Sequence, residues 1–273
     1  MRRPAAVDRT GNTEEAAAIR KDAACWAGLD GAMTHTPTRN PRLPRRLADF
    51  ETLAEGLDYA ARGDTGLNFF SGRGALRAAL PYAQLRAEAV AMARGLVQAG
   101  VPAGARMVLL AETDPNFVIA FLACQYAGII PVPVAIPTVI GGREAYVAGL
   151  RRQIASCGAQ AAMAPAELVP YLEEAARGRD MIVLGGPDDI RALPGGKADL
   201  RPFGRDDLCY LQYSSGSTRH PQGIAIAQRT LMANCHAIAR YGLQVGDDDR
   251  CVSWLPFYHD MGLVGFMLTA LLT

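Results

Sequence analysis

Lysine is almost absent from this 273-residue sequence, which has 28 Lys and Arg residues but only two lysines, Lys21 and Lys197. An excess of charge of either sign is also lacking, because 27 Asp and Glu residues leave a net charge of +1. A protein that attracts nucleic acid or an anionic membrane by its overall field needs a clear positive excess. The composition therefore indicates neither nucleic acid nor a charged membrane surface as a partner.

Closely spaced cysteine pairs are missing as well. None of the six cysteines forms a C-x-x-C pair, and most lie within apolar runs, as buried free thiols do. No apolar run near the N-terminus has the form of a secretory signal. These features predict a protein of a reducing compartment, the cytoplasm. The cysteines are Cys25, Cys124, Cys157, Cys209, Cys235 and Cys251.

Charged residues are absent from residues 117–137, a stretch of 21 residues that is long enough to cross a bilayer. The stretch contains Gln125, Gly128, Pro131 and Pro133. This pattern favours a helix that runs into a buried strand, so we expect no membrane span.

Half of the residues are hydrophobic, which is enough for a sizeable core. Residues 1–46 show no sustained periodicity and contain a Pro/Arg cluster at 36–46, so we expect a flexible extension and linker there. The cluster could contact an acidic partner, but a solvated linker is the simpler interpretation. Residues 47–273 are expected to form the N-terminal portion of one larger domain.

From residue 47 onward, strand and helix patterns alternate. The apolar run 107–111 is typical of a parallel strand covered on both faces, and Asp114-Pro115 predicts a helix start. Repeated βα units predict an α/β fold with a parallel, doubly wound sheet. The expected strands are 67–70, 107–111, 129–134, 159–164, 181–184, 208–213 and 251–255. The expected helices are 81–99, 115–126, 143–156, 166–177, 228–241 and 261–273.

Several common catalytic motifs are absent. The sequence has no Walker A ending, no G-x-S-x-G elbow and no H-E-x-x-H pair. The segment 72–77 lacks the last glycine of a dinucleotide-binding fingerprint. Cys235 and His236 are adjacent on an expected helix and so do not face each other. A P-loop nucleotidase, an α/β-hydrolase and a zinc protease are therefore unsupported.

Residues 208–223, LCYLQYSSGSTRHPQG, are the most informative stretch, and we call them the first signature segment. A strand opens onto four hydroxyl-bearing residues around Gly216, where the backbone can approach a ligand closely. Such a loop can surround phosphate oxygens with N–H and O–H donors. An ordinary Ser/Gly turn between a strand and a helix fits the composition equally well.

Residues 254–263, WLPFYHDMGL, follow at a defined distance, and we call them the second signature segment. Together the two segments resemble the signatures of the adenylate-forming superfamily, which includes acyl-CoA synthetases, fatty acyl-AMP ligases and peptide-synthetase adenylation domains. Their wording, with the segment GGREAY at 141–146, most resembles the fatty acyl-AMP ligases. The resemblance covers residues 47–273.

This resemblance implies two half-reactions. A fatty acid carboxylate attacks the α-phosphate of ATP, which releases pyrophosphate and leaves an acyl-adenylate. The acyl group then passes to the phosphopantetheine of an acyl carrier protein, or of a carrier domain in a polyketide or peptide synthetase. The resemblance also implies Mg²⁺ as a cofactor beside ATP.

Matching positions suggest roles for single residues. The first signature segment would hold the β- and γ-phosphates, with Thr218 placing Mg²⁺, and His259 would lie beside the acyl carboxylate and the α-phosphate. Donors and a metal would offset the charge that develops when one anion attacks another. The candidate nucleotide-binding residues are Ser214, Ser215, Gly216, Ser217, Thr218, Arg219, Gln222 and Gly223.

The sequence departs from the superfamily pattern at two positions. Arg219 stands where many members have glycine, as it often does in fatty acyl-AMP ligases, and Gln222 stands where a lysine or arginine is usual. The loss of that cation removes a point charge from the pyrophosphate region, and Arg219 is placed to compensate.

Alternative interpretations remain for the second signature segment and the residues after it. His259-Asp260 could ligate a metal, although no second His or Cys stands at ligand spacing. Met261, Phe266 and Met267 could line an acyl channel, but core packing is the default for such residues.

The apolar run 261–273 has no stop signal, so we expect the chain to be an incomplete part of such a ligase that is not competent alone. The alternatives are an acyl-CoA synthetase, a peptide-synthetase adenylation domain, or a non-catalytic half-domain that only binds. A cut in mid-fold would also expose a contiguous apolar face.

Overall fold

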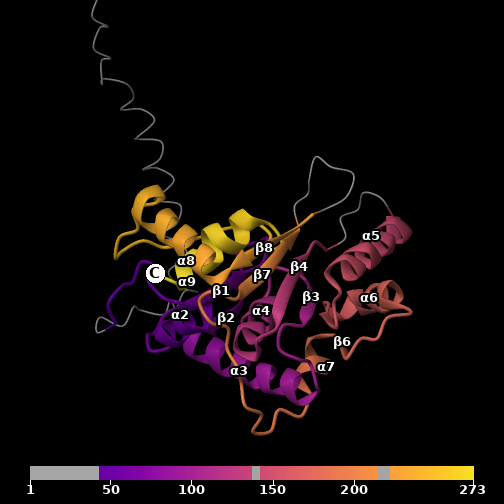
Figure 1. Cartoon of the computed structure of the whole chain (residues 1–273). Coiled ribbons are helices and arrows are strands. Elements are labelled where there is room, and N and C mark those ends of the chain that lie inside the picture. Colours follow the sequence, from indigo (N-terminus) through magenta and orange to yellow (C-terminus); the bar gives the residue numbers. More distant parts are fainter. Residues whose placement is uncertain (1–42, 137–141, 214–221) are drawn as a thin grey trace, which may run out of the picture. The chain divides into compact units, whose positions relative to one another are not determined.

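The computed structural model describes residues 43–136, 142–213 and 222–273, and these ranges belong to one compact unit (Figure 1). Its centre is a four-stranded sheet in the order β4-β3-β5-β6, in which every neighbouring pair is parallel. The strands are β3 (Arg106–Leu110), β4 (Ile130–Val134), β5 (Ala161–Met163) and β6 (Val183–Gly185). The expected parallel α/β sheet is confirmed.

Helices cover both faces of this sheet, because successive side chains of a strand point to opposite sides. On β3, Met107 and Leu109 belong to one buried cluster, and Val108 and Leu110 belong to the other. The first cluster includes buried residues of α3 (Tyr82–Gln98) and α4 (Pro115–Ala127), and the second those of α5 (Gly142–Cys157) and α6 (Val169–Ala176). The sheet is therefore doubly wound.

Helix α4 and strand β4 occupy the charge-free stretch at 117–137. Asp114 caps the helix by accepting from the backbone N–H of Phe117, Pro115 takes its first position, and Gly128 ends it with φ +66°. Every residue from Phe117 to Ala127 is buried. The expected helix that runs into a buried strand is confirmed. In the three described ranges, no helix combines the length and apolarity that crossing a bilayer requires.

Some short elements were not expected. Helix α2 (Leu53–Ala60) begins at Thr52, which caps it, and β2 (Leu76–Pro81) forms an antiparallel hairpin with β1 (Gly66–Phe70). The expected helix 166–177 is divided into a 3₁₀ turn, η2 (Ala166–Leu168), and α6. A single-turn helix, α7 (Pro187–Arg191), follows β6.

The first signature segment begins with the expected strand and ends at the start of a second strand that was not expected. β7 (Leu208–Tyr213) pairs antiparallel with β8 (Gly223–Ala227), and β7 also lies alongside β4 (Figure 1). Helix α8 (Gln228–Ala237) starts directly after β8 and continues as a π-helical turn, η3 (Ile238–Gly242). The prediction of a loop that leads straight into this helix was therefore wrong.

The prediction of a strand at 251–255 is also wrong. In the described part of the chain these residues form no ladder, and Val252 and Trp254 are 81% and 89% exposed. The next segment is helical, as a π-helical stretch η4 (Met261–Leu268) and α9 (Thr269–Leu271). Its core residues are Leu263, Val264, Met267, Leu268, Leu271 and Leu272, so most of this apolar run is covered within the unit.

Two buried glutamines connect four of these elements. Gln125 of α4 donates from Nε2 to the carbonyl oxygen of Cys209 on β7 at 3.0 Å. Its Oε1 accepts from Nε2 of Gln228, the first residue of α8, at 2.7 Å. Gln228 in turn accepts from the backbone N–H of Leu53 on α2 at 2.9 Å. Both glutamines are 0% exposed, so water cannot reach their amides. These hydrogen bonds therefore replace the bonds that the amides would make with water in the unfolded chain.

Replacing Gln125 with alanine should lower the free energy of unfolding by about 2–4 kcal/mol, because a cavity forms and buried groups lose their partners. The matched control is Gln84→Ala on the exposed side of α3, where the amide donates to the Glu88 carboxylate. We expect the control to stay within about 0.5 kcal/mol of wild type. Urea unfolding measures both, and equal losses would contradict the role of the buried pair.

Candidate functional site

The two signature segments are in direct contact. Gln212, near the end of β7, donates from Nε2 to the carbonyl oxygen of Tyr258 at 2.8 Å, across 46 residues of sequence. Gln212 stands two residues before Ser214, and Tyr258 stands immediately before His259. This hydrogen bond therefore brings the start of the predicted phosphate-binding stretch close to the backbone that carries the predicted carboxylate-binding histidine.

The connection between β7 and β8 holds most of the predicted nucleotide site, and residues 214–221 of it lie outside the described residues. Tyr213 and Gly223 face each other in the ladder, so both ends of the connection are fixed. A Cβ on Gly223 would lie 3.4 Å from the Tyr213 ring, which packs against the glycine backbone. Gln222 is exposed directly before β8. The predicted residues that fall outside the description are Ser214, Ser215, Gly216, Ser217, Thr218 and Arg219.

The His259 side chain is exposed and is oriented by its neighbour. Its Nδ1 lies 2.7 Å from Oδ1 of Asp260, while the backbone N–H of Met261 donates to the same carboxylate at 2.8 Å. With a proton on Nδ1, the ring donates to Asp260 and leaves Nε2 free for a second partner. In the described part of the chain, Nε2 has none.

The backbone that carries His259 is rigidly placed. Phe257 is buried, and its ring stacks on Phe117 of α4 with 5.6 Å between centroids and 25° between planes. The His259 N–H donates to the carbonyl of Pro256 at 3.1 Å, and its own carbonyl accepts from Leu263 at 2.9 Å. An exposed side chain on a fixed backbone is the arrangement that ligand binding needs.

Gly262 makes this arrangement possible. A Cβ at this position would overlap the carbonyl oxygens of Pro256 and Leu255, so the helix can start this close to the turn only with glycine. Sequence analysis did not single out Gly262. The available signal was a glycine in the first turn of an apolar helix, where glycine costs about 1 kcal/mol relative to alanine.

Gln212 was missed as well, and its signal was a lone amide in an apolar strand. Its Oε1 is buried and has no partner among the described residues. An unpaired buried acceptor costs about 1–3 kcal/mol, so a donor from a ligand would be favoured here. Beside it, partial burial raises the pKa of the Tyr213 phenol, which remains a neutral hydrogen-bond donor.

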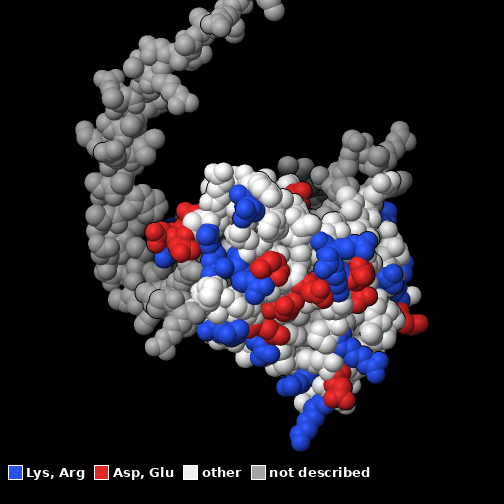
Figure 2. Space-filling model, turned by 60° about the vertical axis from the view of Figure 1, so that its left-hand side comes forward, with Lys and Arg blue, Asp and Glu red and all other residues white. Residues whose placement is uncertain are grey.

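Potential metal ligands do not cluster within the part of the chain that the structure describes. Within the three described ranges, no three His, Cys, Asp or Glu side chains form a group that could hold a metal. Thr218, the predicted Mg²⁺ ligand, lies outside these ranges. On the face shown in Figure 2, acidic and basic side chains are interspersed, in keeping with the net charge of +1.

The chain belongs to the AMP-binding enzyme family, whose pattern it matches over residues 68–273. It is 49% identical over 236 residues to a putative acyl-CoA synthetase of Caulobacter vibrioides, an alignment of 86% of this chain and 41% of that protein. A long-chain-fatty-acid–AMP ligase of Mycolicibacterium smegmatis is 31% identical over 215 residues, or 76% of this chain and 32% of the ligase.

A solved structure agrees with this assignment. It comes from a study of fatty acyl-adenylate ligases from E. coli and L. pneumophila, is 45% identical, and superposes with a TM-score of 0.81. The superposition covers 84% of this chain and 41% of the other. The chain thus spans between about one third and two fifths of the length of these relatives. The expected membership of the family of AMP-binding enzymes is confirmed.

Replacing Gly262 with alanine should lower the free energy of unfolding by about 1–3 kcal/mol, because the added carbon meets two backbone oxygens that cannot rotate away. Gly265→Ala on the same helix is the control, since there the new carbon meets only the flexible end of Met261. Urea unfolding of both variants measures the difference. A loss at Gly265 as large as that at Gly262 would be evidence against the close approach.

Proposed function

We propose that this chain is part of an enzyme that activates a fatty acid with ATP to an acyl-adenylate. The observation that carries the proposal is the Gln212–Tyr258 hydrogen bond, which brings the two signature segments together. The names of the similar proteins, a fatty acid–AMP ligase and fatty acyl-adenylate ligases, support the choice of substrate.

In the first half-reaction a carboxylate oxygen of the fatty acid attacks the α-phosphorus of ATP. The bond between the α-phosphorus and the bridging oxygen breaks, and pyrophosphate leaves with the electron pair. The part of the first signature segment from Ser214 to Gly223 would hold the β- and γ-phosphates through backbone N–H and hydroxyl donors. Bound Mg²⁺ would neutralise part of the phosphate charge, with Thr218 helping to place it.

His259 suits a role beside the two reacting anions. A protonated imidazole can donate from Nδ1 to Asp260 and from Nε2 to a carboxylate or an α-phosphate oxygen at the same time. Asp260 would orient the ring through Nδ1, and the anchored backbone would hold the ring in place. The effect is electrostatic, since a fixed donor aimed at the reacting oxygens offsets part of the repulsion between two anions.

In the second half-reaction the acyl group would pass to the phosphopantetheine thiol of an acyl carrier protein, or of a carrier domain in a polyketide or peptide synthetase. The thiol sulfur attacks the acyl carbon, and AMP leaves. Coenzyme A is the alternative acceptor, as the name of the Caulobacter relative suggests for that protein. We place the reaction in the cytoplasm, where these substrates and free thiols occur together.

The decisive experiment compares residues 1–273 with the protein purified from its native locus, whose intact mass is measured first. Both are given ATP, Mg²⁺ and a fatty acid, and acyl-AMP is detected by mass spectrometry with carrier protein or coenzyme A as acceptor. We expect the native product to form acyl-AMP and to load the carrier protein, with His259→Ala about 100-fold slower.

Residues 1–273 alone should form no acyl-AMP, because they match at most about two fifths of the length of the relatives reported above. Adenylate formation by this piece would contradict that expectation. Coenzyme A thioester as the main product would refute the carrier-protein acceptor. If a native product of 29.1 kDa makes no acyl-AMP, the chain is a binding half-domain.

Gln222 gives a separate test of the pyrophosphate region. The exposed residue stands at the entry to β8, where the superfamily usually carries a cation. Gln222→Lys should lower the KM for ATP or leave it unchanged, because a restored charge-assisted contact contributes about 1–3 kcal/mol at most. Gln222→Ala is the control for the loss of the amide, and a clear rise in KM for the lysine variant would refute the assignment.

A further inference from the structure

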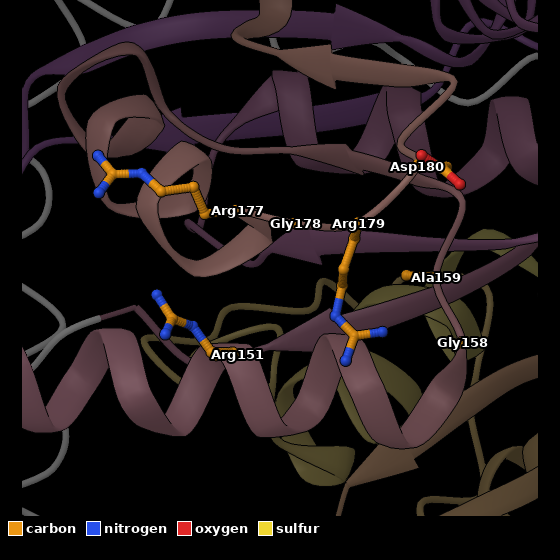
Figure 3. A pocket seen from close by; sticks show the side chains of 7 residues that line it. All are labelled: Arg151, Gly158, Ala159, Arg177, Gly178, Arg179 and Asp180. Carbon is orange, nitrogen blue, oxygen red and sulfur yellow. The ribbon is translucent and has the colours of Figure 1, made fainter.

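A second candidate binding site lies outside both signature segments. A cavity of about 450 Å³ opens between the ends of α5 and α6, at the amino ends of β5 and β6 (Figure 3). Its lining comes from Arg151 in the second half of α5 and from the turns that follow α5 and α6. The lining residues are Arg151, Gly158, Ala159, Arg177, Gly178, Arg179 and Asp180.

Two left-handed turns build this cavity. Gly158 follows α5 with φ +60°, and Gly178 follows the last residues of α6 with φ +80°. Glycine adopts these angles without strain, so each chain reverses directly into its strand. The reversal at Gly178 places Arg177 and Arg179 on either side of the glycine, and both line the cavity together with Arg151. The Arg179 side chain extends toward α5, whereas the Arg177 side chain extends away from Arg179 (Figure 3).

The three guanidinium groups have little to neutralise them. Arg151 donates to the carbonyl oxygen of Glu174 at 2.8 Å, which leaves its other N–H groups available. Among the described residues, the side chains of Arg177 and Arg179 have no hydrogen bond and no ion pair. Asp180 is the one acidic residue of the lining, and its carboxylate points away from all three (Figure 3).

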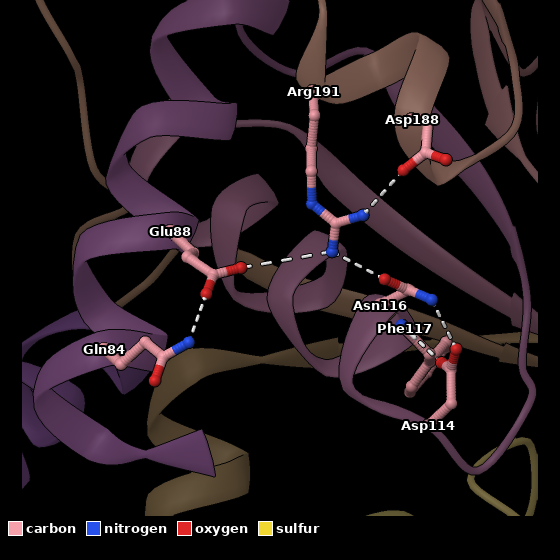
Figure 4. A network of polar contacts seen from close by, with 7 residues as sticks. All are labelled: Gln84, Glu88, Asp114, Asn116, Phe117, Asp188 and Arg191. Carbon is pink, nitrogen blue, oxygen red and sulfur yellow. Dashed lines mark hydrogen bonds and ion pairs between the residues drawn. The ribbon is translucent and has the colours of Figure 1, made fainter. Parts of the chain in front are cut away.

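Another cavity of this unit offers a contrast. Arg191 lines another cavity and is fully engaged, with Asn116 at 2.6 Å, Asp188 at 3.3 Å and Glu88 at 4.0 Å (Figure 4). That arginine ties α7 to α3 and α4 and has a structural role. Arg177 and Arg179 make no such contacts among the described residues. Because like charges that share a cavity repel each other, their arrangement is unfavourable unless an anion binds.

The lining also restricts the ligand. Among the described residues, the lining contains no aromatic side chain and one small apolar one, Ala159, so a nucleobase would find no stacking surface and an acyl chain little apolar surface. Guanidinium groups bind phosphate oxygens through paired N–H donors. We propose that this cavity, which we call the arginine pocket, binds the diphosphate group of a free pyrophosphate or of a larger phosphorylated molecule.

Titration calorimetry on the full chain tests this, with inorganic pyrophosphate in buffer without Mg²⁺. We expect saturable binding that weakens by about tenfold or more in the double variant Arg177→Gln/Arg179→Gln. Arg152→Gln is the control, because it removes a charge from the same helix without touching the pocket. ADP that binds as pyrophosphate does, through the same arginines, would identify the diphosphate as the recognised group, whichever molecule carries it.

A second measurement needs no variant. Phenylglyoxal modifies accessible arginines, and peptide mass spectrometry reports the extent at each one. Pyrophosphate should slow the modification of Arg177 and Arg179 but not of Arg152. Absence of saturable binding, equal binding by the double variant, or absence of protection would overturn the proposal and leave these arginines as positive charges near the carbonyl end of α6.

Discussion

The fold depends on one buried polar contact, the pair formed by Gln125 and Gln228. Hydrophobic burial can hold α4 against the sheet in several ways, because apolar contact has no direction. The two amides add direction, since each has a fixed set of donors and acceptors that must be satisfied out of water. Satisfying them sets the position of α4, β7, α8 and the start of α2 relative to one another.

The relative positions of the two signature segments in the candidate site follow from that arrangement. Gln125 holds β7 at Cys209, three residues before Gln212, and Gln212 holds the second signature segment at Tyr258. Phe257 adds an apolar anchor on α4, the same helix that carries Gln125. The histidine and both ends of the predicted phosphate-binding stretch are thus positioned relative to a single buried helix, and the His259 side chain itself is exposed.

Sequence predicted the elements whose signals are local. Asp114, Pro115 and Gly128 define α4 by capping chemistry alone, and the apolar run 107–111 defines β3. The hairpin partners β2 and β8 were missed, because a short exposed strand is stabilised by its neighbour and not by its own pattern. The apolar run 251–255 misled for the related reason that a strand needs a ladder. At the site, the two signature segments were recognisable as motifs, whereas the Gln212–Tyr258 contact depends on the tertiary fold.

The bond between Leu53 and Gln228 also has a consequence for synthesis. Its two ends are 175 residues apart, and Gly56 of α2 packs against Leu272, still further along the chain. At about 5–20 residues per second, a ribosome needs about 10–35 s to deliver Gln228 after Leu53 has been made. Helices α3 and α4 can cover part of α2 soon after synthesis, but the surface at Gly56 that packs against Leu272 stays uncovered for at least that time. It is therefore a surface on which a chaperone can act before the unit closes.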